Sequence, residues 1–305
     1  MRGMSLRWHT IVVTLNIVLL AFAAHAQTSD VGQHLQNQYQ DRIFLLRGFY
    51  SSDELRYDAT IGTPSPGFWT IDGFVLVTDA KVHGQTLVLQ GRRMPVVSIG
   101  QGFQFQADSP KKRKKTLSVE IEAKLGPGNL VEEVDALTAK IFLTDQDSLV
   151  ASVPSYWQTC VSAGLNENDP KHLGCRFSAE LLPIPGVNPH ADPRSSPGEG
   201  QTSLSEHQMM HVFRAGKDIL PPRAVFSPEP QFSGLARDIG LKGTVTLGLV
   251  VDDQGVPRNI EILYPLGAGL DEQAVAAVTT WKFKPAEQKG HGPVAVKIAV
   301  QVDFH

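Results

Sequence analysis

The chain ends in an unbroken alternation of side chains. Between residues 294 and 304, Val, Ile or Phe occupies every second position, and Ala, Lys, Gln or Asp lies between them. Successive side chains of a β-strand point to opposite faces of a sheet, so this period predicts one long strand with one buried and one solvated face. A half-buried strand needs neighbouring strands and a covering layer, which constrains the fold of the whole C-terminal part.

The segment 241–263 (LKGTVTLGLVVDDQGVPRNIEIL) supplies the neighbouring strands. It predicts a hairpin whose turn is residues 252–255, because Gly255 allows the positive φ of a tight reversal. Pro257 has no N–H to donate, so we expect it at a strand start or a sheet edge. The buried face of the hairpin is predicted to carry Val245, Leu247, Leu249, Val251, Ile260 and Ile262.

Two helices are expected beside these strands. Residues 231–239 predict a short helix that stops at Gly240. Residues 270–281 predict a second helix with an apolar stripe, and Asp271 and Glu272 favour the dipole of its first turn. Residues 216–305 are therefore predicted to be α+β, with two helices on one face of a three-stranded antiparallel sheet. The open edge of such a sheet is a template for a guest strand.

The N-terminal part is predicted to be a separate, mainly β domain over residues 30–182. Residues 31–40 and 130–140 predict helices, and residues 141–143 predict a short strand. The other strand-length runs, rich in Val, Ile, Leu and Phe, are residues 42–50, 73–77, 86–90 and 117–123.

A linker is expected between the two parts. Residues 183–202 (PIPGVNPHADPRSSPGEGQT) are rich in Pro, Gly, Ser and charge, so they cannot bury a core. With the irregular residues that follow, the predicted linker and connector span 183–215.

The first 26 residues predict export from the cytoplasm. Arg2 and Arg7 precede an apolar run at 11–24, and Ala24-His25-Ala26 follows. A basic region, a short apolar region and a small-x-small site are typical of a cleaved signal peptide. The alternative is an uncleaved single-span anchor.

Cys160 and Cys175 are the two cysteines of the chain, and they lie in a polar segment read as a loop. In an oxidising compartment such a pair predicts a disulfide. The alternative is a nucleophilic Cys160 with His172 as its base.

Several polar clusters have a functional and a plainer interpretation. His207 and His211, with His190, could hold a metal, but we favour solvated histidines. The basic run 111–115 could dock on an anionic surface, but we favour a solvated hairpin loop. Asp252 and Asp253 are interpreted as turn residues rather than a catalytic pair.

The remaining sequence features do not predict an enzymatic activity or a cofactor. Trp69 and Trp157 are interpreted as core or rim aromatics of the N-terminal part rather than a sugar-stacking site. A hydrolase in the N-terminal part would need converging titratable groups, and the sequence shows no such cluster. The formal net charge of −3 provides no general attraction to nucleic acid.

The C-terminal part resembles the C-terminal domain of the TonB energy-transducer family. The resemblance covers residues 230–304 and is carried by PQFSGLARDIGLKGTVTLGLVVDDQGVPRNIEIL, LDEQAVAAVTTWKFKPA and GHGPVAVKIAVQVDF. It implies a periplasmic protein that binds an extended segment, the TonB box, of an outer-membrane transporter by strand addition. It also implies an ExbB–ExbD-like inner-membrane partner. A homodimer is left open.

The resemblance also implies where a partner binds. Gln231 matches the glutamine of the family's Gln-Tyr-Pro segment, where Phe232 replaces the tyrosine and Ser233 the proline. Residues 294–304 match the strand that receives the box. The partner-binding residues implied are Gln231, Phe232, Val294, Val296, Lys297, Ile298, Val300 and Gln301.

Three features differ from a full transducer: a cleavable N-terminus, a short spacer and an additional β domain. The alternative function is therefore an exported envelope scaffold that binds partners without energy coupling.

Overall fold

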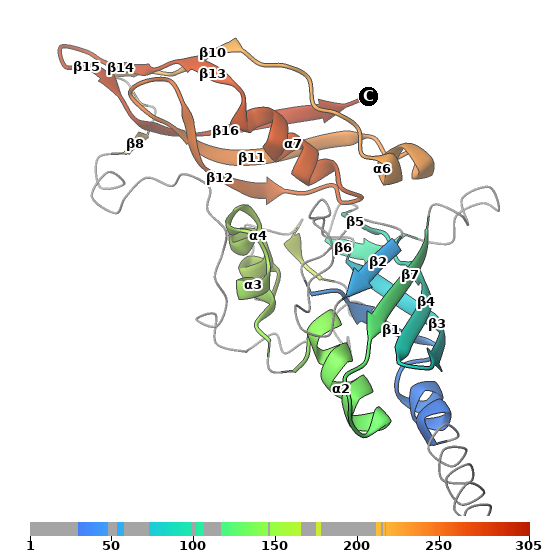
Figure 1. The fold of residues 1–305 in the computed structure, drawn as a ribbon. Coiled ribbons are helices and arrows are strands. Elements are labelled where there is room, and N and C mark those ends of the chain that lie inside the picture. The colour runs from blue at the N-terminus through green and yellow to red at the C-terminus, as the bar shows by residue number, and fades with distance from the viewer. Residues whose placement is uncertain are drawn as a thin grey trace, which may run out of the picture.

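The computed structural model describes residues 30–47, 54–57, 73–98, 102–106, 117–145, 147–165, 175–177, 212–214, 216 and 218–305. The predicted signal segment, Trp69, the basic run 111–115, the linker 183–202 and the histidines at 172, 190, 207 and 211 lie outside these residues. In Figure 1 the C-terminal part lies above the N-terminal part. Among the described residues, no helix is long and apolar enough to cross a membrane.

The N-terminal part contains a five-stranded sheet of order β1-β3-β4-β7-β2. Neighbouring strands are antiparallel, except that β2 runs parallel to β7. Strands lie within or across each of the four predicted runs. The bounds are β1 Arg42–Leu45, β2 Glu54–Tyr57, β3 Phe74–His83, β4 Thr86–Arg93 and β7 Ser118–Lys124. A separate hairpin joins β5 (Val96–Ser98) and β6 (Phe103–Phe105).

Helices pack beside this sheet, and both predicted N-terminal helices are confirmed. Residues 30–38 are helical and bury Val31 and Leu35. The helix α2 (Leu130–Ile141) begins at Asn129, whose side chain accepts from the N–H of Val131. The strand predicted at 141–143 is wrong, because Ile141 ends α2 and Phe142 forms only an isolated bridge to Leu46. That apolar triplet is buried core at a helix end.

The segment between the cysteines was expected to be a loop, and this was also wrong for its described residues, 161–165. Cys160 and the residues after it up to Leu165 belong to α4 (Ser155–Leu165), which follows the short α3 (Leu149–Ser152). The buried residues of α4 recur at helical spacing: Trp157, Cys160, Val161 and Gly164.

The C-terminal sheet has the order β12-β11-β16-β8. Its antiparallel part is β11 (Gly243–Val251), β12 (Pro257–Tyr264) and β16 (Val296–Phe304). The predicted three strands are therefore joined by a fourth, the short parallel strand β8 (Phe213–Arg214). The predicted single strand 294–304 is interrupted at Ala295, since Val294 belongs to β15 (Gly292–Val294).

Small strands surround this sheet. The strand β15 pairs with β14 (Ala286–Gln288), which also pairs with β9 (Ile219–Leu220). The strand β10 (Arg223–Phe226) pairs with β13 (Lys282–Lys284). The predicted 252–255 turn is confirmed. Gly255 has a φ of +79°, and a Cβ at this position would lie 1.9 Å from the carbonyl oxygen of Phe283.

Both predicted C-terminal helices are present. Ser233 caps α6 (Gly234–Ile239), which ends at the left-handed Gly240. The helix α7 (Leu270–Thr279) packs against β11 and β12. Trp281 lies just beyond α7, and its Nε1 donates to the carbonyl oxygen of Pro228 at 3.1 Å.

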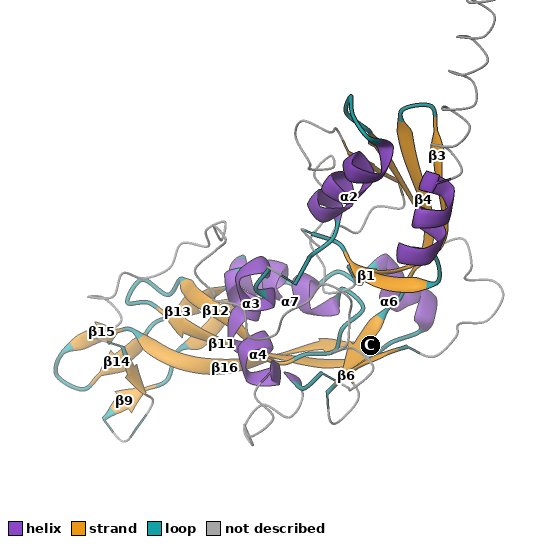
Figure 2. Ribbon diagram, turned by 90° about the horizontal axis from the view of Figure 1, so that it is seen from below, coloured by secondary structure: helices purple, strands orange, loops and turns teal. Residues whose placement is uncertain are grey.

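Two hydrophobic clusters form the core. One lies within the N-terminal part, around α2 and the five-stranded sheet. The other joins the two parts, because Phe103 and Trp157 lie in the same buried cluster as Leu247 and Leu270. Figure 1 shows α4 directly below β12, at this junction, and Figure 2 shows the same arrangement from below. The predicted domain boundary near residue 182 falls outside the described residues.

Candidate functional site

The site predicted from the sequence is the outer edge of β16. The buried face of this strand carries Val302 and Phe304, whereas Ala299, Gln301 and Asp303 are exposed on the other face. Residues of β16 and β11 pair one to one from Val296 to Phe304 without a register shift. The strand is therefore a regular, half-buried ribbon, as the alternation in the sequence predicted.

The backbone groups of β16 alternate between its two neighbours. The N–H of Phe213 in β8 donates to the carbonyl oxygen of Ala295 at 2.9 Å, so the polar groups of Ala295 face away from β11. Since these groups alternate sides along a strand, those of Ala299, Gln301 and Asp303 face the same outer edge. In the described part of the chain, the strand on this edge is β8, and it pairs with Val296 and Lys297 alone. As far as the described residues go, the edge beyond Lys297 is thus open to a further strand.

An aromatic contact lies at the far end of this edge. The ring of Phe232 packs edge-on against Phe304, with ring centroids 5.4 Å apart. Ser233 follows, where its Oγ accepts from the N–H of Ala236 and donates to the carbonyl oxygen of Ala268. Phe232 is half-buried and Gln231 is exposed. The segment before α6 is therefore fastened at the C-terminal end of β16.

The structure brings together some of the predicted partner-binding residues and separates others. Ile298 and Val300 are half-buried beside the open edge, and Gln301 is exposed on it. Val296 is fully buried. The Nζ of Lys297 forms an ion pair with Glu261 of β12, across the exposed face of the sheet. Val294 pairs with Ala286 in β14, outside β16.

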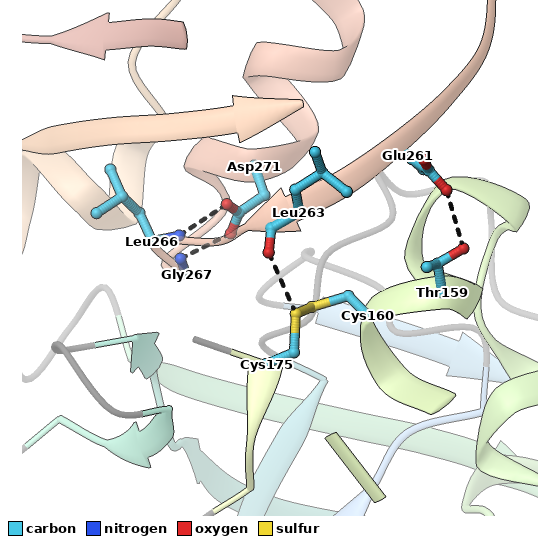
Figure 3. Close-up of a disulfide and its surroundings, with 8 residues drawn as sticks. All are labelled: Thr159, Cys160, Cys175, Glu261, Leu263, Leu266, Gly267 and Asp271. Atoms are coloured by element: carbon cyan, nitrogen blue, oxygen red, sulfur yellow. Dashed lines mark hydrogen bonds between the residues drawn. A yellow bond between two sulfur atoms is a disulfide. The ribbon is translucent and has the colours of Figure 1, made fainter. Parts of the chain in front are cut away.

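The opposite edge of the sheet, at β12, is covered by the N-terminal part (Figure 3). The predicted disulfide between Cys160 and Cys175 is confirmed. The Sγ of Cys175 lies 3.6 Å from the carbonyl oxygen of Leu263, and the Oγ1 of Thr159 donates to Glu261 at 3.2 Å. Because both sulfurs are bonded and buried, the nucleophilic interpretation of Cys160 is wrong for this structure.

A buried polar contact fixes α4 to α7. The Nε1 of Trp157 donates to the Oε1 of Glu272 at 3.0 Å, and both side chains are buried. Burial raises the pKa of the neighbouring Tyr156, and the negative charges of Glu272 and Asp271 raise it further. The core interpretation of Trp157 is confirmed. Its buried carboxylate partner could not be recognised from the sequence, because a first-turn Glu is usually explained by the helix dipole.

The loop before α7 completes the junction. The carboxylate of Asp271 accepts from the N–H groups of Leu266 and Gly267 at 2.8 and 2.6 Å. This holds the loop against β5, where the N–H of Ala268 donates to the carbonyl oxygen of Val96 at 2.9 Å. The predicted dipole carboxylates are thus buried hydrogen-bond acceptors at the contact between the two parts.

Asp252 is a turn residue, as predicted. Its Oδ1 accepts from the N–H groups of Gln254 and Val256 at 3.0 and 2.8 Å, and its Oδ2 binds the Nε of Arg258 at 3.1 Å. The carboxylate is therefore engaged in holding the hairpin.

The N-terminal part has an open pocket of about 490 Å³ between the first helix and α2. Asp135 binds the Nε2 of His34 at 2.7 Å and accepts from the hydroxyl of Tyr39 at 2.8 Å. The hydroxyl side chains of Thr138 and Thr144 also line this pocket. Among the described residues, no group of three His, Cys, Asp or Glu is placed to hold a metal ion.

Comparison with known proteins supports the family resemblance. The family described as "Gram-negative bacterial TonB protein C-terminal" matches residues 228–305. The solution NMR structure of the Pseudomonas aeruginosa TonB C-terminal domain matches with 21% identity, over 30% of this chain and 88% of that chain, at a TM-score of 0.24. No curated protein matches the chain. The predicted resemblance to the TonB C-terminal domain is confirmed for residues 228–305.

Proposed function

We propose that this TonB-like protein binds an extended segment of an outer-membrane transporter by strand addition to β16. The family match to residues 228–305 supports a TonB-like interaction domain. The observation that carries the proposal is the edge beyond Lys297, where described residues leave the backbone groups of Ala299, Gln301 and Asp303 facing outward. Main-chain hydrogen bonds to such an edge give affinity without a preformed pocket.

The guest strand should itself alternate apolar and polar residues. Its inward side chains would lie beside the half-buried Ile298 and Val300 and approach Phe232, whereas its outward side chains would lie beside Ala299 and Gln301. Side chains of neighbouring strands share a face when they lie opposite each other. We therefore propose that apolar residues alternate along the transporter segment.

Energy coupling is a further part of the proposal. A periplasmic location and an ExbB–ExbD-like inner-membrane partner are what a TonB-like transducer requires. We propose no catalytic role and no cofactor.

The test removes one outward N–H without breaking the ladder to β11. Proline has no N–H and is tolerated in edge strands where that group faces outward. Gln301→Pro should therefore keep the fold and weaken binding of synthetic N-terminal segments from the same organism's transporters by at least about tenfold, or about 1.4 kcal/mol. The matched control Gln301→Ala removes the side chain but keeps the N–H, so it should bind like the unaltered chain.

Binding would be measured by fluorescence anisotropy, and folding by circular dichroism. Equal affinities for the folded Gln301→Pro variant and its control would exclude this edge as the binding site.

A second candidate function, an envelope scaffold without energy coupling, is favoured by one observation. The buried contact between Trp157 and Glu272 and the Thr159–Glu261 bond fasten the N-terminal part to the TonB-like part. A transducer that spans the periplasm would be better served by a free spacer. N-terminal sequencing of the mature protein separates the candidates, since a start at Gln27 would leave no membrane anchor for energy coupling.

A further inference from the structure

A strand of this chain already lies on the edge assigned to the guest. In β8, Phe213 lies opposite Val296 and Arg214 lies opposite Lys297, parallel to β16. The N–H of Phe213 donates to the carbonyl oxygen of Ala295 at 2.9 Å. The chain itself therefore provides strand addition at the start of the edge, next to the open positions.

The anchoring of β8 in the described residues comes from the segment that follows it. After Arg214, Gly216 forms a bridge with Ile219, whose N–H donates to the carbonyl oxygen of Gly216 at 3.1 Å. The chain then enters β9, which pairs with β14 and leads away from β16. This path stops β8 from continuing along the edge past Lys297.

Burial holds β8 in place only in part. Both of its residues are exposed, and the large side chain of Phe213 is 38% exposed. A parallel pair is also slightly less stable per residue than an antiparallel one. The strand is therefore held by a few backbone bonds and by the partial burial of Phe213, and another extended segment can replace those bonds one for one.

We propose that β8 is a displaceable internal strand that competes with the guest for the start of the β16 edge. This inference rests on the proposed function. A guest that pairs only along residues 299–303 needs about five residues and binds beside β8, since paired strands advance residue for residue. A guest that pairs along residues 295–303 needs about nine and must remove β8. The edge thus distinguishes extended segments by their length.

The first test needs no transporter. A labelled synthetic peptide of residues 210–217 (MHVFRAGK), which contains β8, is titrated into the full chain and into its Phe213→Pro variant. Loss of the Phe213 N–H should release β8, so the peptide should bind the variant at least about tenfold more tightly. Phe213→Ala keeps the N–H and should stay within about threefold of the unaltered chain.

Hydrogen exchange gives a second measurement on the same proteins. The amide of Lys297, which faces β8, should exchange faster in Phe213→Pro, and protection along β11 should be unchanged. Equal peptide affinity in the unaltered chain and the Phe213→Pro variant, with unchanged exchange at Lys297, would overturn the proposal.

The second test separates this inference from the proposed function. Five- and nine-residue peptides from one transporter segment are compared on both proteins. The nine-residue peptide should bind Phe213→Pro at least about tenfold more tightly than it binds the unaltered chain, whereas the affinity of the five-residue peptide should be the same for both proteins. If both peptides bind but neither binds Phe213→Pro more tightly, β8 does not compete with the guest, and the proposal that β16 binds a guest strand is unaffected. If neither binds either protein, the proposed function fails, and the peptide of residues 210–217 alone decides the role of β8.

Discussion

The two outer strands of the antiparallel C-terminal sheet, β12 and β16, differ in how far other parts of the described chain cover their edges. At β12, the disulfide-bonded Cys175 lies against the backbone of Leu263, and Thr159 of α4 binds Glu261. At β16, two residues of β8 occupy the start, and the described chain leaves the rest open. An exposed edge promotes pairing with other chains, so proteins usually cover or shorten it. Here one edge is covered and the described part of the other is long and regular, which separates a structural edge from the edge proposed to bind a partner.

The same contrast explains the position of the N-terminal part. Its contacts with the sheet gather at β12, the first turn of α7 and the loop before α7. The segment that connects the two edges runs through Ser233, which binds Ala268 in that loop, and Phe232, which packs on the end of β16. Changes at the covered edge should therefore lower stability, and changes at the open edge should lower binding.

The largest expected loss of stability comes from a change at the covered edge, Trp157→Ala. Trp157 is fully buried and its Nε1 binds Glu272, so truncation opens a cavity and should cost about 4 kcal/mol of unfolding free energy. Trp157→Phe keeps much of the ring but loses the N–H, and about 2 kcal/mol is expected. Urea denaturation measures both. A midpoint for Trp157→Ala equal to that of the unaltered chain would show that α4 contributes little to holding the parts together.

The next largest loss of stability is expected when the disulfide is removed. The double variant Cys160→Ser and Cys175→Ser opens a loop with a sequence separation of 15, which should cost about 3 kcal/mol. Hydrogen exchange should rise along β12, where Cys175 covers Leu263, while peptide binding at β16 should stay within about twofold. If the variant lost peptide binding as well, the two edges would not be independent.

Much of the C-terminal sheet could be predicted because local patterns specify it. The alternation in residues 294–304 gave β16, and the Gly255 turn gave the hairpin, since both follow from backbone geometry within a few residues. The break at Ala295 could not be predicted, because the residues on its two sides pair with different strands, Val294 with β14 and Val296 with the distant β8, and the alternation does not specify these partners.

The covered edge could not be predicted for a related reason. Trp157 and Glu272 are 115 residues apart, and no periodicity relates residues at that separation. The sequence did predict the disulfide, from the compartment and the pairing rule. The helix that carries Cys160 was missed because polar residues obscured the spacing of Trp157, Cys160 and Gly164.

A smaller effect is expected where the two edges are connected. Ser233→Ala removes the side-chain cap of α6 and the bond to the carbonyl oxygen of Ala268, so about 1 kcal/mol of stability should be lost. Because Phe232 would be less firmly placed beside Phe304, peptide affinity should fall by about twofold to fivefold. Ser233→Thr keeps a hydroxyl cap and is the matched control. Calorimetry and anisotropy would measure the two effects, and a loss of stability without any change in affinity would show that Phe232 is not part of the binding edge.

The smallest change in stability is expected for a substitution away from both edges, at Asp147. Burial raises the pKa of this carboxyl, but hydrogen bonds from Arg47 and from the backbone and hydroxyl of Thr144 outweigh it and leave the pKa below its usual range. A carboxyl whose pKa is lower in the folded state stabilises the protein above its unfolded pKa of about 4, and this contribution is lost as the pH falls through the folded pKa. Since the Arg47 side chain is 38% exposed, solvent screens the pair, and Asp147→Asn should cost less than about 1 kcal/mol at pH 7. The gap in urea midpoints between this variant and the unaltered chain should narrow as the pH falls below about 4. Peptide binding at β16 should be unchanged, and a gap that widened in acid would mean that the Asp147 pKa is not lowered by folding.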